Sequence, residues 1–301
     1  MPLHRSLDSQ LDFRLVRSLA ESQAEFAGAE ALRLFCTPAL SGRRGPDHAN
    51  LVERARFHLR TARAATVATS SGDLATYTFE PDREPIANVL LVHGWSAEAA
   101  FLGAFAEFLR RRGFRAVLVD LPAHGRSTGR ETNLVDCARA VLQVAEAAGP
   151  FRFALGHSIG AMAVLMAGEG KSPLPRVYPF EGYVLVSMPD KFEDVTRDFG
   201  AELELSPAAQ RDFEQRLEKL AERRIADFTG SNLLGATDKP ALLLHARDDQ
   251  DVPFACAEAM NAARPNAELL AFDGLGHRAI LYAPPVVRAA AAFLVRGSVA
   301  G

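Results

Sequence analysis

Cysteine, tryptophan and long apolar runs are all scarce in this chain of 301 residues. The three cysteines, Cys36, Cys137 and Cys256, are odd in number, far apart and without CxxC spacing, which argues against a disulfide framework and against a zinc cluster. The first residues, MPLHRSLDSQLDF, carry a charge every few positions where a signal peptide needs an unbroken apolar stretch, and no later window is long enough for a membrane span. We therefore expect a cytoplasmic protein with reduced cysteines.

An excess of charge of either sign is also absent. The 34 lysines and arginines against 37 acidic residues give a formal net charge of -3, and the isoelectric point is near 6.3. Such a balance excludes a general attraction to nucleic acid or to an anionic membrane. Because 48% of the residues are hydrophobic, the chain has enough apolar side chains for a large core. The partner that we expect is a small molecule, and the oligomeric state is left open.

Apolar runs and helical patterns alternate over most of the chain. TVATS and LATYTFEP, which flank a Ser-Gly-Asp turn, predict a β-hairpin. After Pro85, continuous apolar runs are interleaved with helical patterns, the last of which continues to about Val295. Strands that are apolar on both faces and alternate with helices are typical of an α/β fold, in which a mostly parallel central sheet has helices on both faces. The runs that predict these strands are NVLLVHG, RAVLVD, FRFALG, YVLVSMP, ALLLHA and AELLAFDG.

Residues 1–60 precede this pattern and predict a helical extension, so that the sheet domain is expected over residues 61–301. Apolar positions between about Ser9 and Phe35 recur every three or four residues, as they do on one amphipathic helix. Basic residues are not concentrated on its polar face, which favours packing on the body of the protein over binding to a membrane surface. The next stretch, CTPALSGRRGPDHAN, predicts an exposed connection.

The alternation is interrupted at about residues 189–238, a segment that is dense in charge. Ser206 followed by Pro207 predicts the start of a helix, with the serine as N-cap and the proline in the first turn. We interpret residues 189–238 as a small helical cap inserted into the sheet domain. The residues expected along one face of its helix are Phe213, Leu217, Leu220 and Arg224.

Ser158 stands between two glycines, in the sequence FALGHSIGAM, where a predicted strand turns into a predicted helix. This context matches the GxSxG elbow, in which a sharp turn presents the serine hydroxyl at the rim of a sheet and the glycines avoid Cβ clashes. The start of the following helix offers N–H groups to a developing oxyanion. We predict that Ser158 is a nucleophile, which needs a neighbouring base.

His277 is the candidate base among eight histidines. It lies in FDGLGHRAI, just after a predicted strand and before the last helix, where a parallel sheet delivers side chains to the same rim as Ser158. His245 ends an otherwise apolar strand, and a structural role for it is equally open. The acid that orients the base is expected from HARDDQDVP, which offers Asp248, Asp249 and Asp251 between the serine and the histidine.

With these motifs in place, residues 65 to 297 resemble the α/β-hydrolase superfamily, in its serine-nucleophile, esterase- and lipase-like branch. The family's acid commonly stands three residues before a Val-Pro pair, and Val252-Pro253 here implies Asp249. The family's oxyanion loop reads HGx, matched by His93-Gly94-Trp95, which implies that the backbone N–H groups of Trp95 and Ile159 form the oxyanion hole. DLPAHGRSTG resembles a structural turn of the family, and we expect no chemistry from it.

The resemblance implies a serine hydrolase that cleaves a carboxylic ester or thioester through an acyl-enzyme, with no metal or organic cofactor. A serine nucleophile argues against the dehalogenase and epoxide hydrolase branches, which have an aspartate at the elbow. Two alternatives stay open: acyl transfer on the same triad, and a non-catalytic protein that uses the fold to bind a ligand. A modestly hydrophobic acyl group is suggested by the apolar residues of the cap, which are Phe192, Val195, Phe199, Phe213 and Leu217.

Overall fold

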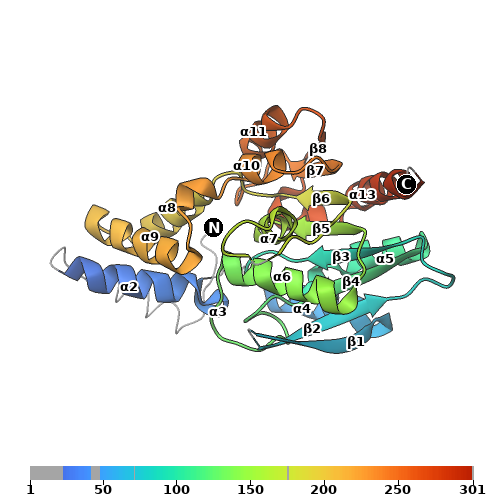
Figure 1. Ribbon diagram of the computed structural model, residues 1–301, viewed down its shortest axis with the longest axis horizontal. Helices are drawn as coiled ribbons and strands as arrows, with labels where there is room; N and C mark the ends of the chain where they lie inside the picture. The colour runs from blue at the N-terminus through green and yellow to red at the C-terminus, as the bar shows by residue number, and fades with distance from the viewer. Residues whose placement is uncertain (1–22, 42–47, 71, 175, 300–301) are drawn as a thin grey trace.

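A central sheet of eight strands organises the protein (Figure 1). The computed structural model describes residues 23–41, 48–70, 72–174 and 176–299. The strands follow one another across the sheet in the order β1-β2-β4-β3-β5-β6-β7-β8. Their bounds are β1 Arg63–Thr69, β2 Gly72–Phe79, β3 Ala87–Val92, β4 Phe114–Val119, β5 Phe153–His157, β6 Gly182–Val186, β7 Ala241–Ala246 and β8 Glu268–Phe272.

The sheet is parallel from β4 to β8 and antiparallel at the other edge. β1 and β2 form the predicted hairpin, with Thr69 opposite Gly72, and β2 also pairs antiparallel with β4. All the remaining pairs are parallel, so each needs a crossover connection, which the helices supply. The predicted α/β class, with a mostly parallel sheet covered by helices, is confirmed.

Helices cover both faces of the sheet. Successive strand residues point to opposite faces, so Leu90 and Val92 enter the core beneath α6 and α7, whereas Val89 and Leu91 enter the core beneath α5 and α13. Figure 1 shows α6 and α7 in front of the sheet and α5 behind it. The covering helices are η3 Ala99–Leu102, α5 Gly103–Arg111, α6 Leu134–Ala148, α7 Ile159–Glu169, α10 Gly230–Gly235, α11 Ala255–Ala263, α12 Gly276–Ala279, η5 Ile280–Tyr282 and α13 Pro284–Val299.

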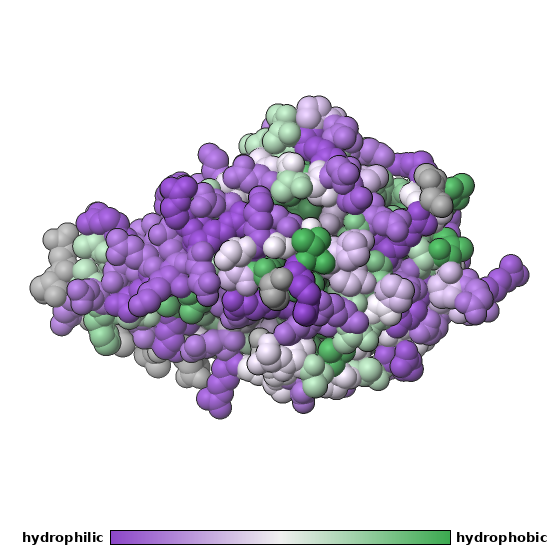
Figure 2. Space-filling model, viewed as in Figure 1, coloured by the Kyte–Doolittle hydropathy of each residue, from purple (hydrophilic) through white to green (hydrophobic). Residues whose placement is uncertain are grey.

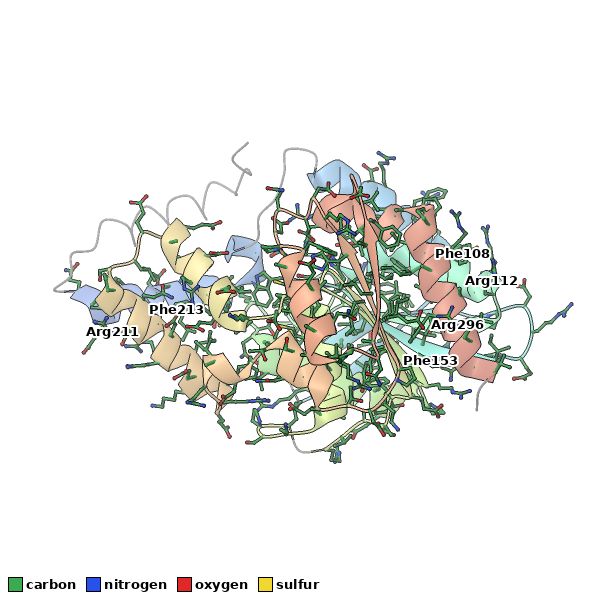
Figure 3. The ribbon with its side chains drawn as sticks, turned by 90° about the horizontal axis from the view of Figure 1, so that it is seen from above. Phe108, Arg112, Phe153, Arg211, Phe213 and Arg296 are labelled. Atoms are coloured by element: carbon green, nitrogen blue, oxygen red, sulfur yellow. The ribbon has the colours of Figure 1, made fainter. Side chains whose placement is uncertain are left out.

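Three further helices project beyond the sheet: α2 (Ala24–Phe35), α8 (Phe192–Glu202) and α9 (Pro207–Ala221). The short helix η4 (Ile225–Asp227) follows α9, and α2 packs along α9. Figure 3 shows the same projection from above, with Phe213 labelled on α9 beside α2. On the face seen in Figure 2 its outer surface is mostly hydrophilic, as expected of amphipathic helices that turn their apolar sides inward.

The predicted start of α9 is correct, but the face predicted for this helix is only partly buried and extends beyond the end of the helix. Ser206 is the N-cap, and its hydroxyl oxygen accepts a hydrogen bond from the backbone N–H of Ala209 at 3.2 Å. Phe213 and Leu217 are buried, whereas Leu220 is 44% exposed and the helix ends before Arg224. The buried positions recur every four residues because α2 packs along α9, and they are Ala209, Phe213, Leu217 and Ala221.

The N-terminal segment also differs from its prediction. Of the helix expected from Ser9 to Phe35, only α2 lies among the described residues, and the rest of that prediction falls outside them. The connection expected after it contains two helices, α3 (Pro38–Ser41) and the start of α4 (His48–Phe57), which η2 (His58–Thr61) follows. α4 is held against the domain by Arg56, whose guanidinium donates to both carboxylate oxygens of Glu98 at 2.7 Å. Such an ion pair between distant residues leaves no periodic signal in the sequence.

All three cysteines are free thiols. Burial raises the pKa of Cys36 and of Cys137 to about 12, so both stay protonated at neutral pH. Cys36 and Cys137 pack in the core as small apolar side chains.

No single helix in the described part of the chain is both long enough and apolar enough to cross a membrane. One pair of helices, Gly276–Tyr282 and Pro284–Val299, meets the length and composition together, with a bend of 65° between its members. The apolar side of the second helix packs on the sheet through residues such as Val286 and Leu294.

Candidate active site

Ser158 lies at a strained turn between β5 and α7. Its backbone has φ 53° and ψ -126°, a conformation that residues other than glycine rarely adopt. The turn is held on both sides, because the Ser158 N–H donates to the carbonyl of Val186 at 2.9 Å and the Ser158 carbonyl accepts from the N–H of Ala161 at 2.9 Å. The neighbouring strand and the new helix therefore stabilise the turn that presents the serine side chain.

The two glycines of this turn are required by close packing. A Cβ on Gly156 would lie 2.4 Å from the Cα of Ala161, and a Cβ on Gly160 would lie 2.3 Å from the carbonyl oxygen of His93. Both contacts are with backbone atoms, which have no room to move aside. Glycine thus lets α7 approach β5 and the end of β3, as the GxSxG pattern predicted.

A pocket of about 230 Å³ opens beside the serine. Four of the predicted site residues line it together: Trp95, Ser158, Ile159 and His277. Ile159 is the first residue of α7, so its N–H is one of those that the helix itself leaves unbonded. The other residues at the wall are Phe35, Gly94, Ser96, Ala97, Phe101, Leu134, His157, Pro189, Phe192, Val195, Asp198, Phe199, Glu202, Asp251, Val252, Arg278 and Leu281.

Asp249 lies behind His277, away from the pocket. The Nδ1–H of His277 donates to the Oδ2 atom of Asp249 at 2.8 Å. The Oδ1 atom accepts from the backbone N–H groups of Asp251 at 3.0 Å and Val252 at 2.8 Å. Burial alone would raise the pKa of the Asp249 carboxyl, but the bonds and charge supplied by His277 and Val252 outweigh it and lower the pKa. Asp249 is therefore ionised and fixes the tautomer of His277 that carries its proton on Nδ1.

The other two acids of this loop have different surroundings. Asp248 is exposed, and its Oδ1 atom accepts from the backbone N–H of Leu275 at 3.2 Å. Asp251 is exposed at the wall of the pocket. His245 is buried beneath the loop, where its Nε2–H donates to the carbonyl of Val252 at 2.9 Å. Of the two roles that the sequence left open for His245, this bond supports the structural one.

His157 is a neighbour of the base that the sequence reasoning missed. Its Nε2–H donates to the backbone carbonyl of His277 at 3.0 Å, and the centroids of the two rings are 4.7 Å apart. Burial, together with the nearby charge of His277, lowers the pKa of His157 well below its ordinary value, so the ring is neutral. The His157 ring therefore stabilises the loop that carries His277. No local sequence pattern predicts this contact, because it joins residues that are 120 positions apart.

The loop after β3 is held by two buried histidines. His93 Nε2 accepts from the backbone N–H of Leu121 at 3.0 Å, and His124 Nε2 accepts from the backbone N–H of Ser96 at 3.0 Å. These bonds tie the segment around Trp95 to the turn after β4. In that turn the Asp120 carboxylate accepts from the N–H of Ala99 at 2.7 Å, which agrees with the structural role expected for DLPAHGRSTG.

Buried neutral histidines predict a loss of stability in mild acid. Burial lowers the pKa of His93 from 6.5 to about 4. Above pH 6.5 its ring is neutral in the folded and the unfolded chain alike, whereas between pH 6.5 and pH 4 only the unfolded chain binds the proton, so acid favours unfolding. Between pH 7 and pH 5 this one group should remove about 2 kcal/mol from the free energy of unfolding.

Urea unfolding of the wild type and of His93→Gln across this range checks the prediction. The glutamine oxygen can still accept from Leu121, and the variant should lose about 2 kcal/mol less than the wild type between pH 7 and pH 5. The difference between the two proteins at pH 8 measures the cost of the substitution itself. Parallel pH curves would show that His93 titrates alike in both states and contradict the prediction.

With this geometry in view, comparison with known proteins identifies the family. Residues 89–291, more than half of the chain, match the profile of the Alpha/beta hydrolase family. The chain belongs to this family. No curated protein matches the sequence of this hydrolase at a significant level.

Several solved structures have a similar fold, and three of them superpose as follows. Est1E from Butyrivibrio proteoclasticus superposes with a TM-score of 0.61 at 17% identity, over 79% of this chain and 99% of that one. Est2, an esterase from Thermogutta terrifontis, gives 0.60 at 20% identity over 82% and 96%. A membrane phospholipase A, described as a bacterial virulence factor, gives 0.61 at 18% identity over 96% and 98%. At these identities the likeness of the hydrolase to each of them shows the fold alone.

The apolar residues that were expected to belong to a cap fall into two sets. Phe192, Val195 and Phe199, all on α8, line the pocket, whereas Phe213 and Leu217 of α9 are buried between helices. A further aromatic lining residue, Phe35, comes from α2, which lies before the residues that match the family. Phe35 could not be identified as a lining residue from the sequence, because an apolar residue at the end of an amphipathic helix gives no sign of which surface it contacts.

Proposed function

We propose that this α/β hydrolase is a serine esterase, which cleaves a carboxylic ester or thioester of a small, modestly hydrophobic substrate. The observation that carries the proposal is the grouping of Ser158 and His277 at one pocket, with His277 Nδ1 held 2.8 Å from Asp249 Oδ2. An activated serine needs a base whose free nitrogen faces it and an acid that orients the base.

Acylation follows from this arrangement. With its proton on Nδ1, His277 has a lone pair on Nε2, which accepts the hydroxyl proton as the Ser158 Oγ atom attacks the substrate carbonyl. The carbonyl oxygen becomes an oxyanion, for which the backbone N–H groups of Trp95 and Ile159 are the proposed donors. When the tetrahedral intermediate collapses, the imidazolium returns the proton to the leaving oxygen or sulfur. The products are a free alcohol or thiol and an acyl group bonded to Ser158.

Deacylation reverses these roles with water. His277 Nε2 takes a proton from the water as its oxygen attacks the acyl carbonyl, and the same donors stabilise the second oxyanion. Collapse breaks the bond to the Ser158 Oγ atom, which recovers its proton from the imidazolium. The carboxylic acid then leaves, and the enzyme is restored with no group consumed except water.

The size and lining of the pocket support the proposed substrate class. About 230 Å³ is below the range of roughly 300–1,000 Å³ that is usual for drug-sized ligands, and the wall is rich in aromatic and aliphatic side chains. One structure of the similar esterase Est2 holds butyrate, a short carboxylate. In the proposed organisation, residues 61–301 form the hydrolase domain, residues 189–238 form its cap, and residues 1–60 form an extension, of which α2 packs on the cap helix α9.

Covalent labelling tests the proposed function. An ethyl fluorophosphonate should react with the wild-type protein, and mass spectrometry of the digest should place one adduct on Ser158. His277→Ala removes the base, so the adduct should be lost from a protein that still unfolds at the wild-type temperature. Folded wild-type protein that gains no adduct on Ser158 would overturn the proposal and favour the ligand-binding alternative.

A further inference from the structure

Among the described residues, Phe35, the last residue of α2, contacts four aromatic rings from three other parts of the protein. Its ring is stacked on Trp95, with centroids 6.2 Å apart and an interplanar angle of 22°. It meets Phe192 of α8 edge-on at 6.0 Å and Phe199 of the same helix at 5.1 Å. It also meets Phe213 of α9 at 5.4 Å. One side chain from the N-terminal segment thus joins the loop after β3 to both long helices of the cap.

The backbone after Phe35 is anchored to the loops that surround the site. The carbonyl of Cys36 accepts from the N–H of Thr132 at 2.8 Å, and the carbonyl of Pro38 accepts from the hydroxyl of Ser96 at 2.8 Å. Ser96 directly follows Trp95 in the chain, so the bond that anchors Ser96 also restricts the position of Trp95. The distance between Phe35 and the region of the proposed oxyanion hole is therefore set by hydrogen bonds.

The first turns of α2, far from Phe35, are held against α9 by close helix packing. Gly28 of α2 faces Asp212 of α9, and a Cβ on Gly28 would lie 2.3 Å from the Oδ2 atom of that aspartate. The cap is also tied at its base, where Asp190 Oδ1 accepts from the N–H of Ser231 at 2.8 Å and from its hydroxyl at 2.6 Å. α2 and α9 therefore pack closely, and the ring of Phe35 is fixed by its contacts with α8 and α9.

Phe35 lines the same pocket as Ser158, and so do Trp95, Phe192 and Phe199. We propose that Phe35 is a specificity-determining residue, whose ring limits the length of the apolar substrate group that the pocket accepts. The N-terminal segment then takes part in substrate selection although it lies before the residues that match the family. This inference rests on the proposed esterase function, because it concerns the ester whose carbonyl Ser158 is proposed to attack in this pocket.

Replacing Phe35 by alanine should extend the accepted chain. The phenyl ring is removed, and its space becomes available to further methylene groups of the substrate, each of which gains roughly fourfold in binding when it is buried. We expect the ratio of kcat/KM for p-nitrophenyl octanoate to that for p-nitrophenyl butyrate to rise by about tenfold or more. A second series consists of butyrate esters of alcohols of increasing length. If the alcohol, and not the acyl group, contacts Phe35, the ratio of kcat/KM for a long alcohol to that for a short alcohol should rise in this series instead.

Phe26→Ala is the matched control. Phe26 lies on the same helix, but its side chain is 57% exposed and it does not line the pocket, so both ratios should stay at the wild-type value. Phe35→Leu keeps an apolar side chain and should shift the ratio in the same direction by less, which provides a reading if the alanine variant fails to fold. In each variant, the rate of labelling by the short ethyl fluorophosphonate reports whether Ser158 is still activated.

The outcomes separate the two proposals. A raised ratio in either series, with the labelling rate kept, supports the role of Phe35. Wild-type ratios in both series, in a Phe35 variant that is still labelled at Ser158, overturn that role and leave the esterase function standing. Wild-type protein that neither cleaves the esters nor is labelled overturns the esterase function, and the inference falls with it.

Discussion

Ser158→Ala is expected to lower kcat for a p-nitrophenyl ester by about 10⁴- to 10⁶-fold, close to the rate of the reaction without nucleophilic catalysis. The proposed chemistry starts at the Ser158 Oγ atom, and no acyl-enzyme can form without it. KM should change little, because the methyl group of alanine leaves the pocket wall in place. Alanine keeps the positive φ that the turn imposes, so the backbone strain of the folded protein is similar in both proteins.

Steady-state kinetics and urea unfolding together decide this prediction. Ser298→Ala is a suitable control, because Ser298 lies on α13, away from the pocket, and its hydroxyl donates only to the helix carbonyl of Leu294. The control should keep the wild-type kcat. If Ser158→Ala retained a tenth of the wild-type kcat, the hydrolysis would have another origin in the protein or its preparation, and Ser158 would lose its assigned role.

The parts of the site that could be predicted are those with a local sequence signature. The elbow is set within a few residues of Ser158, because Gly156 and Gly160 are the positions where any Cβ would strike backbone. The parallel sheet then brings the carboxyl ends of β5, β7 and β8 to one rim, which is why their places after strands predict that Ser158, Asp249 and His277 lie close together. For Asp249 the resemblance to a family was also needed, since three acids share the loop.

The parts that could not be predicted depend on contacts between distant segments. Leu220 shares the predicted face of α9 with Phe213 and Leu217 but is exposed, because the pattern of one helix does not reveal how its partner α2 crosses it. Phe35 and His157 have the same explanation: Phe35 was correctly placed at the end of a helix and His157 lies just after the predicted strand FRFALG, but the role of each comes from the rings and carbonyls of other elements. Local periodicity specifies which side of a helix is buried better than it specifies what covers that side.

The second large effect is expected from Asp249→Asn, which should lower kcat by about 10⁴-fold while the protein stays folded. The Oδ1 atom of residue 249 is held by the N–H groups of Asp251 and Val252, and an asparagine oxygen can keep both bonds. The amide NH₂ group must then face His277, where the carboxylate now accepts. As a donor, it forces His277 to accept at Nδ1 and to carry its proton on Nε2. In that tautomer the ring has no lone pair for the hydroxyl proton of Ser158.

Asp248→Asn is the matched control for this change. It removes the same charge from the same loop, one residue away, at an exposed side chain that accepts from the backbone N–H of Leu275. We expect this control to stay within a few-fold of the wild-type kcat, since surface charge changes of this kind alter local energies by less than about 1 kcal/mol. Equal losses in the two variants would mean that the loop acts through its net charge. A large loss in Asp249→Asn alone means that the atom facing His277 decides the rate, because the charge removed is the same in both.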